Sequence, residues 1–197
     1  EMHHASFGCT TPALDISKSG AKVTCRGCLF HANELSLKIS QEAVVFLENT
    51  VIRDNTAPCS TITVTEASVL NVRATLFKNN IAYAEGGALQ ILKGSIVNIT
   101  GSTFDGNLAY VSGGAVSLSE SVATFQTTSF TRNRARDQGA GAVWVSSGHL
   151  VVKDSTFVGN EGNAYGGAIQ GDTSETNIVV QRSFFSKNED IRGGAIA

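Results

Sequence analysis

Apolar and polar residues alternate in short runs along most of the chain, and similar runs return at a nearly constant interval. In residues 89–91, 116–118 and 143–145, apolar side chains flank a single polar or aromatic one. A second alternating pair lies farther along each repeat, at Val23/Cys25, Val45/Leu47, Leu70/Val72, Val97/Ile99, Ala123/Phe125, Leu150/Val152 and Ile178/Val180. A period of two residues is typical of short β-strands and not of helices.

A phenylalanine followed three residues later by an asparagine marks a third short strand in each repeat. The phenylalanines are Phe30, Phe77, Phe104, Phe130, Phe157 and Phe185, and Ile52 replaces phenylalanine in one repeat. The asparagines are Asn33, Asn55, Asn80, Asn107, Asn133, Asn160 and Asn188. Gly-Gly-Ala follows at residues 86–88, 113–115, 166–168 and 193–195, and residues 139–142 read Gly-Ala-Gly-Ala.

Cutting the chain after each glycine pair divides it into units of about 27 residues. The units are 13–34, 35–59, 60–87, 88–114, 115–141, 142–167 and 168–194, and an eighth begins at residue 195. Three short strands bury an apolar face only when the units stack. The sequence therefore predicts an all-β fold, a right-handed single-stranded parallel β-helix (a pectin-lyase-like solenoid) of about seven coils. Residues 1–12 are expected to form an amino-terminal cap or linker.

In such a fold equivalent residues lie above one another, about 4.8 Å apart. The phenylalanine column then forms an internal aromatic stack, and the asparagine amides bond from coil to coil as a ladder. Asparagine also tolerates the left-handed backbone of a turn, and the glycine pairs supply a corner that a Cβ would obstruct. These roles are structural, so we expect no cofactor and no metal.

Composition and charge narrow the function classes. The chain has 197 residues, 16% of them charged, and a formal net charge of −2, which excludes the electrostatic footprint of a nucleic-acid-binding protein. No apolar run reaches the length of about 18 residues that a membrane-spanning helix needs. The sequence stops at the start of an eighth unit. Because an open β-helix end exposes an apolar cross-section, we expect the remainder of a longer chain to pack on the carboxyl end.

Four cysteines lie in the first third of the chain: Cys9, Cys25, Cys28 and Cys59. Their even number, together with an Asn-x-Thr sequon at Asn98, favours an oxidising extracellular or cell-surface location. We expect two disulfides, and three connectivities are open. A zinc site that includes Cys25-x-x-Cys28 and a set of buried reduced thiols are the alternatives. Asn98 lies between two inward positions, so its side chain points outward and is a candidate for glycosylation.

Candidate chemistry on the outer face is sparse. One column, four residues after the phenylalanine, holds Arg134, Glu161 and Glu189 on successive coils. Two stacked glutamates repel each other, which raises the pKa of one of them. Such a pair is a faint signal of a carbohydrate-active enzyme. The alternative is a surface ion pair between Arg134 and Glu161. The other carboxylates fall in different columns, so we predict a chain without catalytic residues.

Exposed aromatic residues indicate a binding surface instead. Tyr83 and Tyr110 share a column after the asparagine, and Trp144 lies on the outward side of its strand. Such side chains can form a platform for a glycan or a contact with a protein. Scattered surface residues are the alternative interpretation.

The repeated Gly-Gly-Ala-Ile/Leu/Val with Phe-x-x-Asn resembles the repeat of the chlamydial polymorphic outer membrane proteins, which is also found in surface proteins of algae and protists. The resemblance covers residues 60–197 well and residues 13–59 loosely, where Gly-Gly-Ala is missing. It implies a surface-displayed β-helix linked to adhesion. We therefore expect a rigid extracellular rod or fibre component whose partners are other protein subunits or cell-surface and matrix glycans. A carbohydrate-active lyase or hydrolase, or its inactive remnant, is the alternative.

Overall fold

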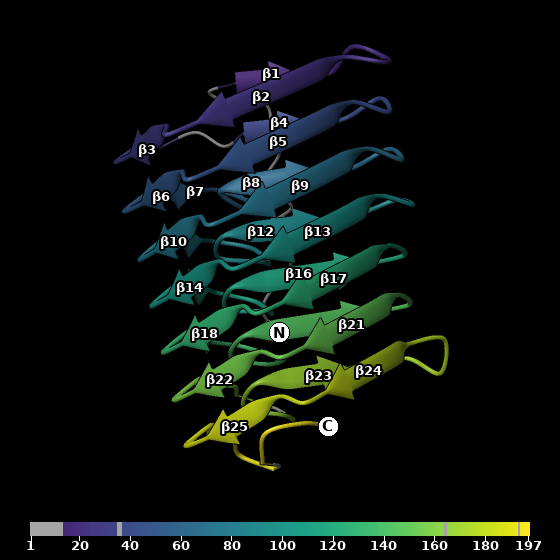
Figure 1. Ribbon diagram of the computed structural model, residues 1–197. Helices are drawn as coiled ribbons and strands as arrows, with labels where there is room; N and C mark the ends of the chain where they lie inside the picture. The colour runs from purple at the N-terminus through teal and green to yellow at the C-terminus, as the bar shows by residue number, and fades with distance from the viewer. Residues whose placement is uncertain (1–13, 35–36, 164, 193) are drawn as a thin grey trace, which may run out of the picture.

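The computed structural model describes residues 14–34, 37–163, 165–192 and 194–197. Within these residues all regular structure is β-strand, and the strands of each sheet pair in parallel with the equivalent strands of neighbouring turns. The chain winds as a right-handed parallel β-helix of about seven turns, which confirms the predicted fold class. Figure 1 shows the turns stacked along one axis, from β1 at one end to β25 near the other.

Three sheets run along the whole rod. Sheet A contains β1 (Leu14–Ile16), β4 (Leu37–Ile39), β8 (Ile62–Val64), β12 (Leu89–Ile91), β16 (Val116–Ser119), β20 (Val143–Ser146) and β23 (Ile169–Gly171). Sheet B contains β2 (Lys22–Arg26), β5 (Val44–Glu48), β9 (Val69–Arg73), β13 (Ile96–Thr100), β17 (Val122–Gln126), β21 (His149–Lys153) and β24 (Asn177–Gln181). Sheet C contains β3 (Leu29–His31), β6 (Val51–Arg53), β10 (Leu76–Lys78), β14 (Thr103–Asp105), β18 (Ser129–Thr131), β22 (Thr156–Val158) and β25 (Phe184–Ser186). In Figure 1 the strands of sheet B lie in front of those of sheet A, and sheet C forms the left side of the rod.

A fourth sheet corrects the expectation of three strands per unit. Sheet D contains β7 (Thr56–Ala57), β11 (Ile81–Ala82), β15 (Leu108–Ala109) and β19 (Arg134–Ala135). Strands of two residues are too short to show alternation, so the hydrophobic pattern misses them. Their signal is a buried alanine two residues after the ladder asparagine, as in residues 80–82 and 107–109.

Inward-facing side chains of sheets A, B and C fill the rod with apolar groups. In the middle turns, Leu89 and Ile91 of β12 and Val97 and Ile99 of β13 are fully buried. Burial of each such side chain contributes about 1.5–3 kcal/mol. Stacking of like residues in columns therefore supplies most of the stabilising free energy, since no single turn encloses them alone.

The phenylalanine column forms a stack of parallel rings on the inner face of sheet C. Neighbouring ring centroids are 4.3–4.8 Å apart, and the ring planes differ by only 2–6°. The stacked rings belong to Phe77, Phe104, Phe130, Phe157 and Phe185. This spacing follows the separation of hydrogen-bonded strands, about 4.8 Å, so the sheet sets the ring arrangement. Phe30 shares the column but lies outside the continuous stack, because Ile52 stands between it and Phe77.

The asparagine column forms an unbroken ladder of hydrogen bonds from Asn33 to Asn188. Along it, each Nδ2 donates to the Oδ1 of the next asparagine at 2.8–2.9 Å. At Asn133, Oδ1 accepts bonds from the backbone N and the Nδ2 of Asn107. Its Nδ2 donates to Asn160 Oδ1 and to the carbonyl oxygen of Phe104. The fully buried amide therefore uses its two donors and its two acceptor positions.

The sequence predicts that each ladder asparagine adopts the left-handed backbone of the turn. This prediction is wrong, because the left-handed residue is the one before each ladder asparagine. The φ angles at this position are 51–64°. The residues are Ala32, Asp54, Asn79, Gly106, Arg132, Gly159 and Lys187. One left-handed residue redirects the chain at the end of sheet C, and the following asparagine then points its amide into the rod.

The glycine pairs form a tight corner between sheets D and A. A Cβ on Gly114 would collide with the carbonyl oxygen of Gly141 in the next turn and with the backbone of Arg134. In the copy at residues 139–142 the second glycine is retained as Gly141. In the strand register, Ser60 is equivalent to Gly87, the second glycine of the next turn. The second unit therefore ends at residue 60, one residue later than the cut at residue 59 that the sequence suggests.

Candidate functional site

A cleft of about 520 Å³ opens between the outer face of sheet A and the loops that lead into that sheet. Trp144 of β20 and Gln170 of β23 supply its sheet side, and they are paired directly in the strand register. The loops add polar and aromatic side chains from several turns: Glu85, Gln138, Asn163, Tyr165 and Arg192. We call this the Trp144 cleft. It brings together residues that lie far apart in the sequence.

The position of the Trp144 indole depends on the space left by a neighbouring glycine, Gly139. Trp144 is half-buried and outward-facing between Ser117 and Gln170. A Cβ on Gly139 would lie 3.0 Å from Trp144 Cδ1 and 2.7 Å from the Cβ of Ser112. Gly139 also has a φ of +79°, a conformation that residues with a Cβ rarely adopt. The Gly-Ala-Gly-Ala variant of the repeat therefore makes room for the aromatic ring.

Gln170 carries an acceptor that the described residues leave without a donor. Its side chain is 6% exposed and lines the cleft, and Oε1 receives no hydrogen bond from these residues. A buried polar atom without a partner destabilises the fold by about 1–3 kcal/mol. Oε1 itself is covered, so a ligand reaches this acceptor only when the Gln170 side chain turns toward the cleft.

Two further side chains are held in defined positions at the cleft. Glu85 Oε2 accepts hydrogen bonds from Ser117 Oγ at 3.0 Å and from Gln90 Nε2 at 3.4 Å. Arg192 Nη1 donates to the hydroxyl of Tyr165 at 2.6 Å, and its guanidinium lies 5.2 Å from the centre of that ring. The cleft thus combines aromatic faces with the carboxylates of Glu85 and Asp172, a guanidinium and amides, the groups that bind the apolar faces and hydroxyls of a sugar.

Tyr83 and Tyr110 do not line the cleft. Their rings lie against each other with centroids 5.1 Å apart and planes tilted by 45°. The guanidinium of Arg136 lies 4.6 Å from the centre of the Tyr110 ring. The three side chains form a separate stacked column on consecutive turns, so only Trp144 of the three sequence-predicted aromatic residues belongs to the cleft.

Arg134, Glu161 and Glu189 lie on successive turns in one column, joined by parallel bridges. Arg134 Nη2 is 2.9 Å from Glu161 Oε1, and both side chains are about half exposed. Exposed pairs of this kind contribute about 0–1 kcal/mol. The structure therefore contains the surface ion pair between Arg134 and Glu161.

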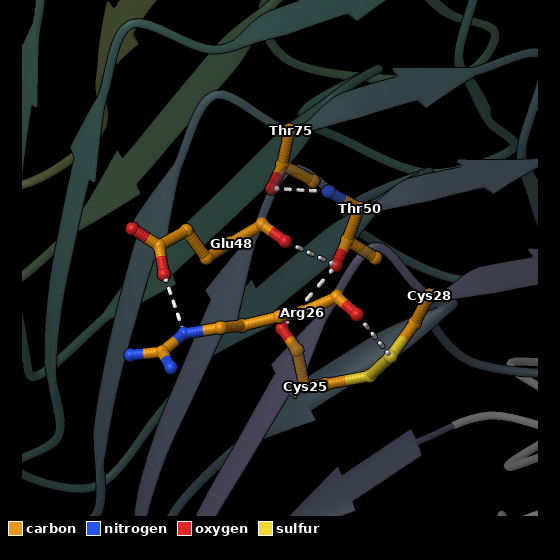
Figure 2. The surroundings of a disulfide bond; sticks show 6 residues. All are labelled: Cys25, Arg26, Cys28, Glu48, Thr50 and Thr75. Atoms are coloured by element: carbon orange, nitrogen blue, oxygen red, sulfur yellow. Dashed lines mark hydrogen bonds and ion pairs between the residues drawn. A yellow bond between two sulfur atoms is a disulfide. The ribbon is translucent and has the colours of Figure 1, made fainter.

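The cysteines are oxidised where the structure describes them. Cys25 and Cys28 form a disulfide across the turn between β2 and β3, with Cα atoms 6.0 Å apart (Figure 2). Cys59 is also disulfide-bonded, and Cys9 lies outside the described residues. The zinc site and the reduced thiols are therefore wrong for Cys25, Cys28 and Cys59. Cys28, Thr50 and Thr75 occupy equivalent positions on three consecutive turns. In this column the backbone N of Thr50 donates a hydrogen bond to Thr75 Oγ1 at 3.5 Å.

Asn98 lies on the outer face of sheet B, and its side chain is exposed. Its Nδ2 donates a hydrogen bond to Asn71 Oδ1 at 3.1 Å. The outward orientation that the sequon requires is present, and modification of Asn98 stays a prediction.

Comparisons with protein families, curated proteins and solved structures find no match to this chain. Among the described residues, no three or more His, Cys, Asp or Glu side chains gather as metal ligands. In the same part of the chain, no helix has the length and hydrophobicity to cross a membrane.

Proposed function

We propose that this chain is a non-catalytic extracellular or cell-surface β-helical module that binds a glycan in the Trp144 cleft. The observation that carries the proposal is the outward indole of Trp144 in a cleft that is also lined by Glu85, Asp172 and Arg192. The indole offers a flat apolar face to a sugar ring, and the carboxylates of Glu85 and Asp172 are acceptors for its hydroxyls.

The fold supports a role as a rigid rod. Equivalent residues repeat on about seven turns, so the surface presents the cleft at a fixed place along the axis. The Cys25–Cys28 disulfide supports an oxidising compartment. The resemblance to the repeat of the chlamydial polymorphic outer membrane proteins supports an adhesive surface module.

The test is titration of the whole chain with neutral oligosaccharides that differ in linkage, followed by calorimetry. We expect at least one of them to bind, with the Trp144→Ala variant weakening the binding about tenfold or more. Glu85→Gln keeps the volume and removes a charged acceptor, so it should also weaken binding. Tyr83→Ala is the matched control, because Tyr83 is exposed outside the cleft.

Two results would overturn the proposal. In the first, no neutral oligosaccharide binds, or Trp144→Ala binds as tightly as the parent chain while its circular dichroism is unchanged. In the second, the chain releases reducing or unsaturated sugars from a polysaccharide and Glu161→Gln abolishes that activity. The second result would establish the enzyme alternative.

A further inference from the structure

The outer face of sheet B is basic in a chain whose net charge is −2. Its outward positions follow from the strand register, which alternates them with the buried columns. The cationic side chains at these positions are Lys22, Arg26, Arg73 and Lys153. Glu48 is the single carboxylate among the outward residues of these seven strands. This concentration of cations creates a local positive potential that attracts anionic ligands.

A groove of about 650 Å³ crosses β2, β5, β9 and β13 on this face. Phe46 lies in its middle column, between Thr24 and Asn71 in the register. Lys22 Nζ is 5.5 Å from the centre of the Phe46 ring on one side. On the other side, Arg26, Glu48 and Arg73 form a charged column on consecutive strands.

Glu48 is outnumbered by cations in this groove. Its Oε2 is 2.8 Å from Arg26 Nε, and its Oε1 is 4.0 Å from Arg73 Nη1. The side chains of Arg26 and Arg73 are 75% and 76% exposed, so most of their donors face solvent. Figure 2 shows the Arg26 guanidinium extending beyond its contact with Glu48. The terminal nitrogens of both arginines can therefore donate to a second carboxylate.

Neutral polar groups complete the groove. Asn98 Nδ2 donates a hydrogen bond to Asn71 Oδ1. Asn98 Oδ1 remains as an acceptor for a ligand, and the two N–H groups of the Asn71 side chain remain as donors. The hydroxyls of Thr24 and Thr100 also line it. An aromatic ring with amides, hydroxyls and flanking cations is suited to a sugar ring that bears a carboxylate.

We infer that this groove binds an acidic oligosaccharide, with uronate carboxylates on Arg26 and Arg73 and a sugar ring on Phe46. The backbone of a sheet face is already paired within the sheet, so an extended peptide would find no main-chain partners there. A sugar needs side-chain partners only. The site belongs to sheet B, shares no lining residue with the Trp144 cleft and is independent of the function proposed above.

The experiment titrates the whole chain, produced in a host that does not glycosylate Asn98, with an α-1,4-linked oligogalacturonate. The fully methyl-esterified oligomer is the neutral ligand and polyglutamate is the acidic peptide. We expect the oligogalacturonate to bind, its affinity to fall with rising salt, and the two other ligands to bind at least about tenfold more weakly. Binding of either comparison ligand as tightly as the oligogalacturonate would contradict the inference.

Variants locate the site. The double variant Arg26→Gln with Arg73→Gln should weaken oligogalacturonate binding about tenfold or more. Glu48→Gln should strengthen it, because it removes the competing carboxylate. Arg134→Gln, on sheet D, is the control for lost charge, and Trp144→Ala should leave this binding unchanged. Parent-like affinity in the double variant would overturn the inference. Loss of oligogalacturonate binding in Trp144→Ala would instead assign the ligand to the other cleft.

Discussion

Asn133 makes four hydrogen bonds from a fully buried side chain, and each bond joins it to a neighbouring turn. A buried amide is tolerated when all its donors and acceptors are used, because desolvation is then compensated. The repeat provides this compensation automatically, since each ladder asparagine meets an identical side chain. The ladder therefore stabilises the stacking of turns in a way that an isolated buried amide does not.

Asn133→Ala should lower the free energy of unfolding by about 1–3 kcal/mol, because it leaves the amide of Asn107 without its acceptor. Chemical denaturation measures the change. Asn98→Ala is the control, because Asn98 bonds Asn71 on the exposed face, and it should change stability by less than about 0.5 kcal/mol. Equal effects of the two substitutions would argue against a stabilising ladder.

Asp154 and Arg182 form an exposed ion pair between turns, with Nε–Oδ1 at 2.7 Å and Nη2–Oδ2 at 2.9 Å. The hydrogen bonds from Arg182 lower the pKa of the Asp154 carboxyl and raise the pKa of Arg182. A carboxyl whose pKa is lowered by folding stabilises the protein above its unfolded pKa of about 3.9. This stabilisation is lost as the pH falls through the lower folded pKa.

Asp154→Asn should therefore lower the melting temperature at pH 7, and the difference from the parent chain should shrink as the pH falls below about 3.9. Thermal unfolding over a pH series measures it. Arg182→Gln breaks the same pair and should show the same pH dependence. A difference that stays constant down to the most acid pH would exclude the ion pair as its cause.

Each strand pairs with the same strand of its neighbours, so a column behaves as a unit along the rod. The rings of sheet C are parallel within 2–6° because the strand register superimposes them. Phe130 contacts rings above and below it, whereas Phe30 has Ile52 on one side and is only partly buried. The same residue type therefore contributes differently at different turns.

Phe130→Ala should destabilise the chain by about 3–5 kcal/mol, because it opens a cavity between two stacked rings. Phe30→Ala, the matched substitution at the first turn, should lower stability by about 1 kcal/mol, because this side chain is partly solvated. Denaturant unfolding of both variants gives the comparison. If Phe30→Ala is as destabilising as Phe130→Ala, the packing of the end turn is as complete as that of the middle.

At the scale of the whole molecule, the inner columns are uniform and the outer faces differ. The outer face of sheet B presents the basic groove around Phe46, and the outer face of sheet A presents the cleft around Trp144. Both sites join side chains from three or more turns, so both depend on the stacking that the core provides. A variant that breaks the core should weaken both sites together, whereas a surface variant should affect one.

The sequence by itself determined the period, the columns and which residues face inward, and the fold class follows from these. It did so because stacking brings each repeated residue onto its own copy, so one period specifies the contacts of every turn. Only the tertiary structure decided sheet D, the left-handed residue before each asparagine and the grouping of Trp144, Gln170 and Arg192. Sheet D and the left-handed residue recur from turn to turn, but two-residue strands show no alternation and the residue type at the left-handed position varies, so neither leaves a hydrophobic pattern. The grouping of the three side chains depends on loops that differ between turns and therefore has no period from which to infer it.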